Sequence, residues 1–449
     1  MQVRGRKVTV VGMGETCIAL VRLLLREGAH PFVTESNNAP KIAGRSRELE
    51  ALGVPYEIGG HTLAAFAGPE LVISSPGVSP HIAPIQQAVA EGADVIGEME
   101  FAYSFCDSRV LAVTGTNGKT TTTELLRALV AACGHSVVLA GNNAFPFSAA
   151  VMLEQAPEFI VLEVSSYQLE TAQCFRPWIG AVLNITPDHL ARHGSLDHYA
   201  SVKARMFMNQ QRGDVAVINH DDPLVRDMAL HSLASVWPFS LGTRLEAGLW
   251  LDGLIIRHGS EVVASASDTA LPGRHNLQNV LCALTMMRAG GFDWEKTIDG
   301  VRGFRGVEHR IEHVAEFQGI DFYNDSKSTN IDSLKVAIES FDRPVVLIAG
   351  GEGKGSDYRV LRDLVRERVR KMVTIGLDAP KLEEAFGDLV TAERAEDMAD
   401  AVERAARTAV SGDVVLLSPA CASFDMFDNF EHRGRVYKEC VLRRFNKRT

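Results

Sequence analysis

The chain alternates short apolar runs rich in β-branched residues with longer stretches in which apolar residues recur at helical spacing. This alternation is typical of parallel α/β sheets. The pattern predicts helices over Thr16–Glu27, Asn276–Ala289, Val360–Val369 and Met398–Ala409. It predicts strands over Lys7–Val11, Pro31–Thr34, Leu71–Ser74, Val110–Thr114, Phe159–Leu162, Ala181–Ile185, Asp214–Asn219, Val345–Ala349 and Val414–Leu417, and Val95–Gly97 closes the first unit.

Changes in this pattern divide the chain. Between Glu246 and Ser267 apolar and polar residues alternate, which predicts a small antiparallel excursion. No internal repeat, low-complexity tract or long linker interrupts the sequence. We predict three α/β domains, over residues 1–98, 99–306 and 307–449.

Composition narrows the class of protein. A net charge of −10 over 449 residues argues against a nucleic-acid partner, because phosphate backbones require a basic face. The seven cysteines form no C-x-x-C pair, which favours reduced thiols in the cytoplasm. Basic residues precede the apolar run at Val8–Val11, as in a signal peptide, but Gly12–Glu15 breaks that run early. No apolar stretch is long enough to span a membrane. We therefore expect a cytoplasmic protein.

The clearest motif is Gly115-Thr116-Asn117-Gly118-Lys119-Thr120, between a β-rich run and a helix start. Backbone N–H groups of such a loop bind phosphate oxygens. Lys119 would neutralise the β- and γ-phosphates, and the Thr120 hydroxyl would ligate Mg²⁺. Val113 stands where the strict pattern has its first glycine, so an ordinary glycine turn is the alternative.

A second glycine-bearing loop, Gly12-Met13-Gly14, follows the first predicted strand. Cys17 stands where a dinucleotide fingerprint has its third glycine, and Glu35 ends the next strand. NAD binding, UDP binding and a close-packed turn remain three open interpretations.

Polar residues follow the later strands. Glu163 ends the run Ile160–Leu162, where it could hold Mg²⁺ or face solvent. His189 ends a second strand and could contact metal or substrate, although a surface role is the plainer interpretation. Lys203, taken alone, reads as an exposed helix lysine.

Two polar segments stand out in the last third of the chain. The loop 350–355 is either a second phosphate or carboxylate site or a flexible turn. The segment 324–330 is too densely polar to be core, and helix capping is its alternative role.

In this order, these pieces resemble the Mur ligase family along the whole chain. Segments 162–170, 324–330 and 417–425, the last continuing to 429–431, are similar to the D-glutamate-adding members of that family. These segments argue against its folate polyglutamate and third-residue ligases. A nicotinamide-dependent dehydrogenase would leave Lys119 unexplained, and a nucleotide switch would need no amino acid.

The resemblance implies an ATP-dependent ligase that adds D-glutamate to UDP-N-acetylmuramoyl-L-alanine through an acyl phosphate, in cytoplasmic peptidoglycan precursor synthesis. It implies a Rossmann-like UDP-binding domain, a central P-loop ATPase-type domain with a mainly parallel sheet, and a Rossmann-like amino-acid-binding domain. ATP and two Mg²⁺ ions are expected, with small-molecule substrates as the only partners and a monomeric chain.

The resemblance also assigns residues. Those matched to the UDP substrate are Thr16, Glu35, Ser36, Gly77, Asn142 and Ser165. Those matched to ATP are Gly115, Thr116, Asn117, Gly118, Lys119, Thr120, Thr121, Asn276, Arg310 and Asp325. Those matched to D-glutamate are Lys327, Thr329, Lys354, Ser423, Phe424 and Phe430. The matched metal ligands are Thr120, Glu163, His189 and a carbamylated Lys203, and Lys119, Glu163, His189 and Lys203 match catalytic positions.

Four residues of the first loop region depart from the family pattern. Glu15 replaces an apolar residue, Cys17 a glycine, Glu35 an aspartate and Asn37 a basic residue. They put the geometry of uracil recognition in doubt but leave the ligase chemistry untouched.

Overall fold

The structure is a computed structural model that describes residues 1–38, 42–142, 145–230, 232–353 and 355–446. It divides into two compact units, one of residues 1–269 with 278–302 and the other of residues 270–277 with 303–449. The first unit contains two sheets and the second contains one, so the predicted three-domain α/β class is confirmed. The boundaries 98/99 and 306/307 stay predictions.

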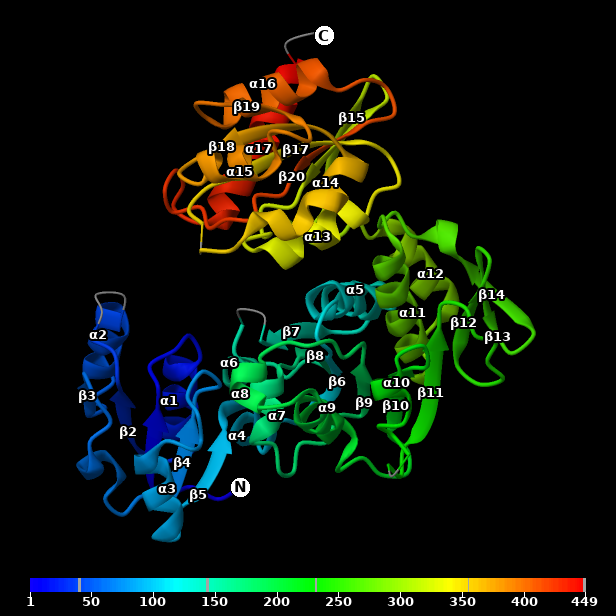
Figure 1. The fold of residues 1–449 in the computed structure, drawn as a ribbon. Helices are drawn as coiled ribbons and strands as arrows, with labels where there is room; N and C mark the ends of the chain where they lie inside the picture. The colour runs from blue at the N-terminus through cyan, green and yellow to red at the C-terminus, as the bar shows by residue number, and fades with distance from the viewer. Residues whose placement is uncertain (39–41, 143–144, 231, 354, 447–449) are drawn as a thin grey trace. The chain divides into compact units, whose positions relative to one another are not determined.

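The first sheet is wholly parallel, in the order β3-β2-β1-β4-β5 (blue in Figure 1). The chain reverses its direction of winding between β1 and β4, and such switch points bind ligands at the carboxyl ends of the strands. Apolar residues of α1 and α2 pack on one face, and those of α3 and a short 3₁₀ turn at Leu63–Phe66 pack on the other. The elements are β1 (Lys7–Val11), α1 (Cys17–Arg26), β2 (His30–Glu35), α2 (Ala43–Ala51), β3 (Tyr56–Ile58), β4 (Leu71–Ser74), α3 (Ala83–Ala90), β5 (Asp94–Gly97) and α4 (Glu98–Tyr103).

The central sheet has nine strands, in the order β14-β13-β12-β11-β10-β9-β6-β8-β7. It is parallel up to β12, and β12, β13 and β14 form the predicted antiparallel excursion. Its strands are β6 (Arg109–Thr114), β7 (Val137–Gly141), β8 (Phe159–Glu163), β9 (Ile179–Val182), β10 (Val215–Asn219), β11 (Ser235–Ser240), β12 (Leu249–Asp252), β13 (Ile255–His258) and β14 (Glu261–Ser265). Its helices are α5 (Lys119–Ala132), α6 (Phe147–Ala150), α7 (Ser166–Glu170), α8 (Leu190–His193), α9 (Leu196–Ala204), α10 (Pro223–Arg226), α11 (Arg274–Ala289) and α12 (Trp294–Gly303).

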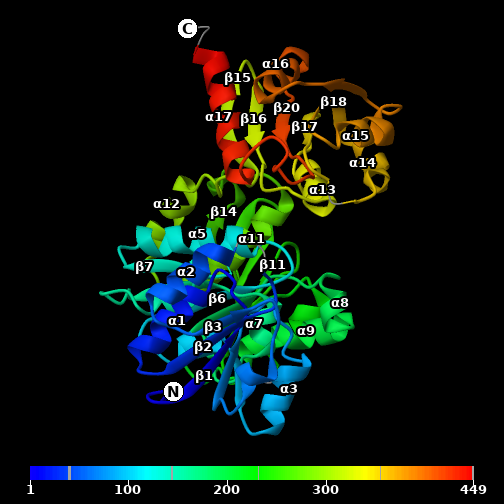
Figure 2. The ribbon, with the colours of Figure 1, turned by 90° about the vertical axis from the view of Figure 1, so that its left-hand side faces the viewer.

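The third sheet runs in the order β15-β16-β20-β17-β18-β19, and only β15 is antiparallel to its neighbour. Helices α13, α14 and α15 supply the core on one face, and α16 and α17 the core on the other (Figure 2). The strands are β15 (Glu312–Phe317), β16 (Ile320–Asn324), β17 (Val345–Gly350), β18 (Val369–Ile375), β19 (Thr391–Arg394) and β20 (Val414–Leu417). The helices are α13 (Ile331–Glu339), α14 (Arg362–Arg368), α15 (Ala379–Phe386), α16 (Met398–Thr408) and α17 (Phe430–Asn446).

Two predicted elements have different ends in the structure. The helix predicted over Val360–Val369 begins as a 3₁₀ turn at Tyr358–Leu361, and Val369 opens β18 by pairing with Val345. A buried β-branched residue is better placed in that sheet than on a helix end. The strand predicted to reach Ile185 ends at Val182. In the part of the chain that the structure describes, no helix has the length and hydropathy that crossing a bilayer requires.

Candidate active site

The loop between β6 and α5 has the shape of a phosphate site. Gly118, which precedes α5, has φ +86°, and a Cβ there would lie 2.2 Å from Oδ1 of Asn279. The N–H of Asn117 donates to Oδ1 of Asn184 (2.9 Å), and Nδ2 of Asn184 donates back to the Asn117 carbonyl (3.1 Å). The position after Asn117 therefore requires glycine, and the loop is fixed before any ligand arrives.

The remaining threonines of the motif lie at the loop and the first turn of α5. Thr116 Oγ1 accepts a hydrogen bond from the Thr186 N–H (3.0 Å). Thr120 and Thr121 are buried in that first turn. The loop is thus held against the segment that follows β9.

Two lysines point at the same carbonyl of this loop. Lys119 Nζ donates to the carbonyls of Gly115 and Thr116, at 2.9 Å each. Lys203 Nζ donates to the same Gly115 carbonyl (2.9 Å) and to Oγ1 of Thr114 (3.1 Å). The Lys119 ammonium gives this loop a positive charge, which suits a polyanion, and it disfavours a second charge on the Lys203 nitrogen beside it.

Lys203 is only 1% exposed, so the interpretation as an exposed helix lysine is wrong. Burial, and then the nearby Lys119 ammonium, lower the pKa of Lys203 well below its usual range. The burial results from contacts with residues almost ninety positions earlier, which helical spacing alone does not reveal. A lysine in this setting has access to its neutral, nucleophilic form.

Glu163 lies at the end of β8 and is 3% exposed. Its Oε1 accepts a hydrogen bond from Nδ2 of Asn142 (3.1 Å). Its Oε2 is buried and has no hydrogen-bond partner among the described residues. A buried carboxylate oxygen without a donor is costly, and a hard cation would satisfy it.

His189 precedes α8 in a left-handed conformation, with φ +53°. Its side chain is 47% exposed, and its Nε2 lies 3.3 Å from Oδ2 of Asp188. The ring packs against Tyr167, with 4.9 Å between the ring centroids. His189 is therefore accessible to a ligand on one side and supported by an aromatic ring on another.

The glycine loop after β1 is organised by a carboxylate. Oε2 of Glu35 accepts a hydrogen bond from the Met13 N–H (2.6 Å), and Oε1 accepts one from the Asn37 N–H (2.7 Å). Partial burial opposes ionisation, but these hydrogen bonds hold the pKa of Glu35 below its usual range. Gly12 is required here, because its φ is +96° and a Cβ would lie 2.9 Å from Oγ of Ser75.

The other residues matched to the UDP substrate lie at carboxyl ends of strands in the first unit. Thr16 precedes α1 without a side-chain cap, Ser36 Oγ donates to Glu35 (3.3 Å), and Gly77 lies in the turn after β4. Ser165 caps α7 through a reciprocal pair of hydrogen bonds with Gln168. Cys17 is fully buried, which raises its pKa to about 12, so it fills the place of the third glycine as a core residue.

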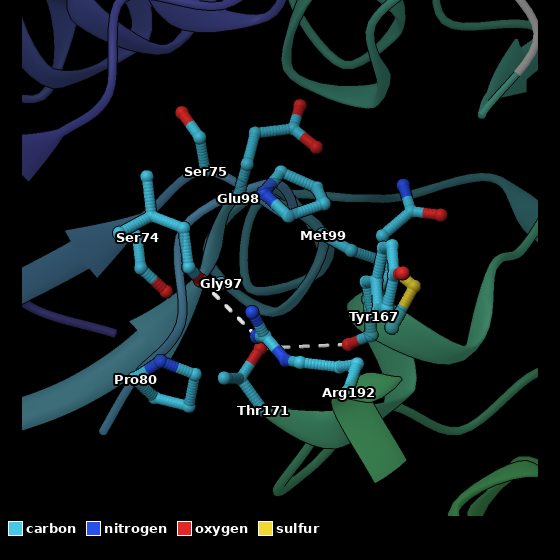
Figure 3. Close-up of a pocket in the computed structure, with 12 residues that line it drawn as sticks. Ser74, Ser75, Pro80, Gly97, Glu98, Met99, Tyr167, Thr171 and Arg192 are labelled. Carbon is cyan, nitrogen blue, oxygen red and sulfur yellow. Dashed lines mark hydrogen bonds between the residues drawn. The ribbon is translucent and has the colours of Figure 1, made fainter. Parts of the chain in front are cut away.

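A cavity of about 10 Å³ lies between the ends of β4 and β5 and helices α7 and α8 (Figure 3). Its lining includes Ser75, Gly97, Tyr167 and Arg192. This volume holds about one water molecule. The cavity therefore lies where the elements of the first two sheets meet, and it is too small to hold a substrate alone.

In the second unit, Asp325 lies at the end of β16 and is buried. Its Oδ1 accepts a hydrogen bond from the Ile311 N–H (3.2 Å), and its Oδ2 accepts one from Oγ of Ser418 (2.8 Å). Burial raises the pKa of Asp325 to about 7. Nε of the adjacent Arg310 is buried without a partner among the described residues, and Asn276 Nδ2 donates to the Pro272 carbonyl (2.7 Å).

Two of the residues matched to D-glutamate, Lys327 and Phe430, meet at the start of α17. Lys327 Nζ lies 5.7 Å from the centroid of the Phe430 ring. Ser423 is buried, whereas Phe424 is 70% exposed and Thr329 is partly buried. Lys354 lies outside the described residues.

Two expectations about the polar segments need correction. Asn324, Asp325, Ser326 and Ser328 are all buried, so the segment 324–330 does belong to a core, a polar and hydrogen-bonded one. Asn330 does cap α13, as the alternative proposed. The loop 350–353 is clamped rather than flexible: a Cβ on three of its glycines would lie within 2.3 Å of other atoms, at Gly350, Gly351 and Gly353.

Sequence reasoning missed Arg433, which joins the polar segments. Its buried guanidinium donates to the side chain and carbonyl of Ser326 and to the carbonyls of Cys421 and Ala422, at 2.8 to 3.2 Å. Burial lowers its pKa to about 10. The spacing of Arg433, Tyr437 and Val441, all buried on one face of α17, was the signal that could have found it.

Three family models match successive parts of the chain. Residues 6–97 match the Mur ligase MurD-like N-terminal domain, residues 113–287 the Mur ligase middle domain, and residues 309–421 the Mur ligase glutamate ligase domain. They cover the three sheets in turn.

Full-length relatives and solved structures agree with these matches. The chain is 43% identical to the UDP-N-acetylmuramoylalanine–D-glutamate ligase of Pelotomaculum thermopropionicum, over 97% of each chain, and 41% identical to that of Koribacter versatilis, over 98% of each. The fold is similar to that of the UDP-N-acetylmuramate-alanine ligase of Thermotoga maritima (TM-score 0.59, 18% identity, 99% of this chain and 100% of that one). It is also similar to the MurF ligase of Thermotoga maritima, solved in complex with ADP (TM-score 0.56, 17% identity, 100% of this chain and 97% of that one). The chain belongs to the Mur ligase family.

Proposed function

We propose that the chain adds D-glutamate to UDP-N-acetylmuramoyl-L-alanine at the expense of ATP, as its full-length relatives are named to do. The observation that carries the ligase chemistry is the placement of Lys119 and Lys203 on the carbonyl of Gly115. A carboxylate and ATP repel each other because both are anionic. The Lys119 ammonium at the phosphate loop, together with Mg²⁺ held near Lys203, would offset that repulsion.

The β6–α5 loop, residues 115–121, would bind the phosphates of ATP, with backbone N–H groups at the start of α5 and the ammonium of Lys119 as donors. Asn276, Arg310 and Asp325 would contact the adenine and ribose. The buried, unpartnered Nε of Arg310 supports this assignment, because a ligand oxygen would satisfy it.

The residues present fit Mg²⁺. The Oε2 of Glu163 is a buried carboxylate oxygen that a cation would satisfy, and Thr120 lies in the first turn of α5, beside the loop. His189 and Lys203 would form a second site. CO₂ would convert the neutral Lys203 amine to a carbamate, an anionic oxygen ligand, and the lowered pKa of Lys203 supports this step. When bound, the two ions would neutralise charge on the phosphates and the carboxylate.

The substrates would occupy two further regions. Thr16, Glu35, Ser36 and Gly77 would hold the UDP part, with Asn142 and Ser165 further along the sugar-peptide. Incoming D-glutamate would bind near Lys327 and Phe430, together with the other residues matched to it: Thr329, Lys354, Ser423 and Phe424.

The reaction would proceed in two steps. The γ-phosphoryl group passes from ATP to the alanine carboxylate, which gives an acyl phosphate and ADP. The amine of D-glutamate then attacks the acyl carbon, a tetrahedral intermediate forms, and phosphate leaves as the nitrogen loses a proton. Alignment of the reactants is worth about 7–11 kcal/mol in such reactions. The enzyme would act as a monomer in the cytoplasm, on small-molecule substrates and on no nucleic acid.

Phosphate release from ATP and Mg²⁺ tests this proposal. We expect release only when UDP-N-acetylmuramoyl-L-alanine and D-glutamate are both present, with L-glutamate inactive. Release that requires neither substrate would instead indicate a nucleotide-binding protein with another role.

A further inference from the structure

Arg192, on α8, connects the two sheets of the first unit. Its guanidinium donates to Oε2 of Glu170 through NH2 (2.8 Å) and Nε (3.2 Å), and its NH2 also donates to the carbonyl of Val78 (3.2 Å). The side chains of Arg192 and Glu170 are largely buried, at 17% and 12% exposed respectively. Charge-assisted bonds of this kind hold their partners firmly.

The same guanidinium lies on an aromatic ring that supports His189. It is 5.2 Å from the centroid of the Tyr167 ring, and Figure 3 shows the two side chains side by side. Tyr167 in turn packs against the imidazole of His189, at 4.9 Å between centroids. A chain of contacts therefore runs from Arg192 through Tyr167 to His189.

Helix α8 depends on such anchors. It has four residues, Leu190–His193, and a single turn is not stable alone. Its backbone is tied to His189, whose carbonyl accepts hydrogen bonds from the N–H groups of Arg192 (2.9 Å) and His193 (3.1 Å). His193 adds a second anchor through Ser166 (3.0 Å between Nε2 and Oγ). The place of His189 is thus set by the side chains that hold this turn.

The other end of the connection lies in the first sheet. Val78 follows Gly77, which is matched to the UDP substrate, in the turn after β4. The Val78 N–H donates to the Ser75 carbonyl (2.9 Å), and Ser75 Oγ donates to the Gly12 carbonyl (3.1 Å). The carbonyl that Arg192 holds therefore belongs to the same turn that would bind the substrate.

We propose that Arg192 is a positioning residue that couples binding of the UDP substrate to binding of a cation at His189. This inference rests on the proposed function, which assigns the substrate to the Gly77 turn and a metal to His189. When the substrate orders that turn, the Val78 carbonyl fixes Arg192, and Arg192 holds Tyr167 and α8 in place for His189. By thermodynamic linkage, the cation must strengthen substrate binding by the same factor by which the substrate strengthens binding of the cation.

Calorimetric titration tests the coupling without relying on turnover. UDP-N-acetylmuramoyl-L-alanine is titrated into the full chain at low and high Mg²⁺, with a saturating non-hydrolysable ATP analogue. In the wild type we expect high Mg²⁺ to tighten binding about fivefold or more, the lower end of typical couplings. In Arg192→Ala we expect the effect of Mg²⁺ on substrate affinity to fall below about twofold. In Arg192→Lys we expect an effect between those of Arg192→Ala and the wild type, since lysine keeps the positive charge but lacks the forked donors of the guanidinium.

Arg288→Ala is a matched control. Arg288 also pairs with a carboxylate, Glu261 (3.1 Å), and lies on an aromatic ring, Trp294 (5.1 Å), but at the antiparallel end of the central sheet. It should retain the wild-type Mg²⁺ effect. Full coupling in Arg192→Ala would overturn the inference, and so would a wild type that binds substrate with no Mg²⁺ effect. If Arg192→Ala does not fold, full coupling in Arg192→Lys overturns it. A wild type that does not bind the UDP substrate contradicts the proposed function itself.

Discussion

The first unit contains two loops of the same local design, and they differ in charge. The loop after β1 and the loop after β6 both join a buried parallel strand to a helix. Each contains a glycine, Gly12 in one and Gly118 in the other, whose positive φ and close neighbours disfavour a side chain. In the first loop the carboxylate of Glu35 accepts a hydrogen bond from the Met13 N–H. In the second loop the Lys119 ammonium and the side-chain nitrogen of Lys203 both donate hydrogen bonds to the Gly115 carbonyl.

This difference decides what each loop can bind. A carboxylate accepts hydrogen bonds from ligand N–H and O–H groups, as in uracil or ribose, and repels phosphate. A lysine ammonium beside the N-terminus of a helix attracts phosphate. The shared strand–loop–helix design therefore gives the place of a site, and the side chains around it give the chemistry.

The largest expected effect comes from Lys119→Ala, which removes the cation from the phosphate loop. We expect kcat/KM to fall by about 10²- to 10³-fold, as for other electrostatic groups in active sites. Steady-state ADP release measures it. Lys296→Ala, at an exposed lysine of α12, should behave as the wild type. More than half of the wild-type activity in Lys119→Ala would refute the assignment of this loop.

Glu163→Gln should have the second-largest effect on activity. The substitution keeps the shape and the acceptor for Asn142 but removes the charge that would hold Mg²⁺. Because metal stabilisation is worth several kcal/mol, we expect a loss in kcat on the order of 10²-fold. A titration of activity against Mg²⁺ should also show a higher half-saturating concentration. An unchanged Mg²⁺ profile would exclude Glu163 as a ligand.

The two loops can be compared through their glycines. Gly12→Ala and Gly118→Ala each place a Cβ in a left-handed residue and against a neighbour, so we expect each to lose about 1–2 kcal/mol of unfolding free energy or more. Gly14→Ala meets nothing closer than 4.0 Å and should be nearly neutral. Urea denaturation measures all three. Equal stability of Gly14→Ala and Gly12→Ala would contradict the close approach to Ser75.

The buried amine of Lys203 should make the free energy of unfolding depend on pH. Its pKa is lowered in the folded state, so the unfolded chain binds more protons between that lowered pKa and the ordinary lysine value of about 10.5. Through this window the wild type should gain stability relative to Lys203→Met as the pH rises. Urea denaturation in CO₂-free buffer at several pH values measures the difference. A gap that is constant with pH would contradict the burial of the amine.

Glu35 gives a pH dependence of the same sign, in the acid range, and the smallest effect. Its folded-state pKa is lowered, so the stability that it contributes is present above the unfolded value near 4.5 and is lost as the pH falls through the folded value. Glu35→Gln should therefore be less stable than the wild type at neutral pH, and the difference should vanish in acid. Thermal unfolding at several pH values from 7 downward tests it, and a difference that does not shrink as the pH falls would contradict ionisation as its cause.

The sequence was sufficient for features that are local. The strand before Gly115, the helix start at Lys119 and the alternation before Ser267 follow from short patterns, and the structure contains all three. The α/β class and its parallel sheets follow from the same alternation.

Features that depend on distant residues could not be predicted. Lys203 is buried because Thr114 and Gly115 lie beside it, and Gly118 is required because Asn279 lies beside it. The polar segment after β16 belongs to a core because Arg433, more than a hundred residues later, supplies its donors. Such partners are set by the fold rather than by spacing along the chain.

Paired binding titrations test the comparison of the two loops most directly. A fluorescent ATP analogue and UDP-N-acetylmuramoyl-L-alanine are each titrated into the wild type, Lys119→Ala and Glu35→Gln. We expect Lys119→Ala to lose binding of the ATP analogue and keep binding of the UDP substrate, and Glu35→Gln to do the reverse. Loss of the ATP analogue in Glu35→Gln, with retention in Lys119→Ala, would contradict the assignment of both loops.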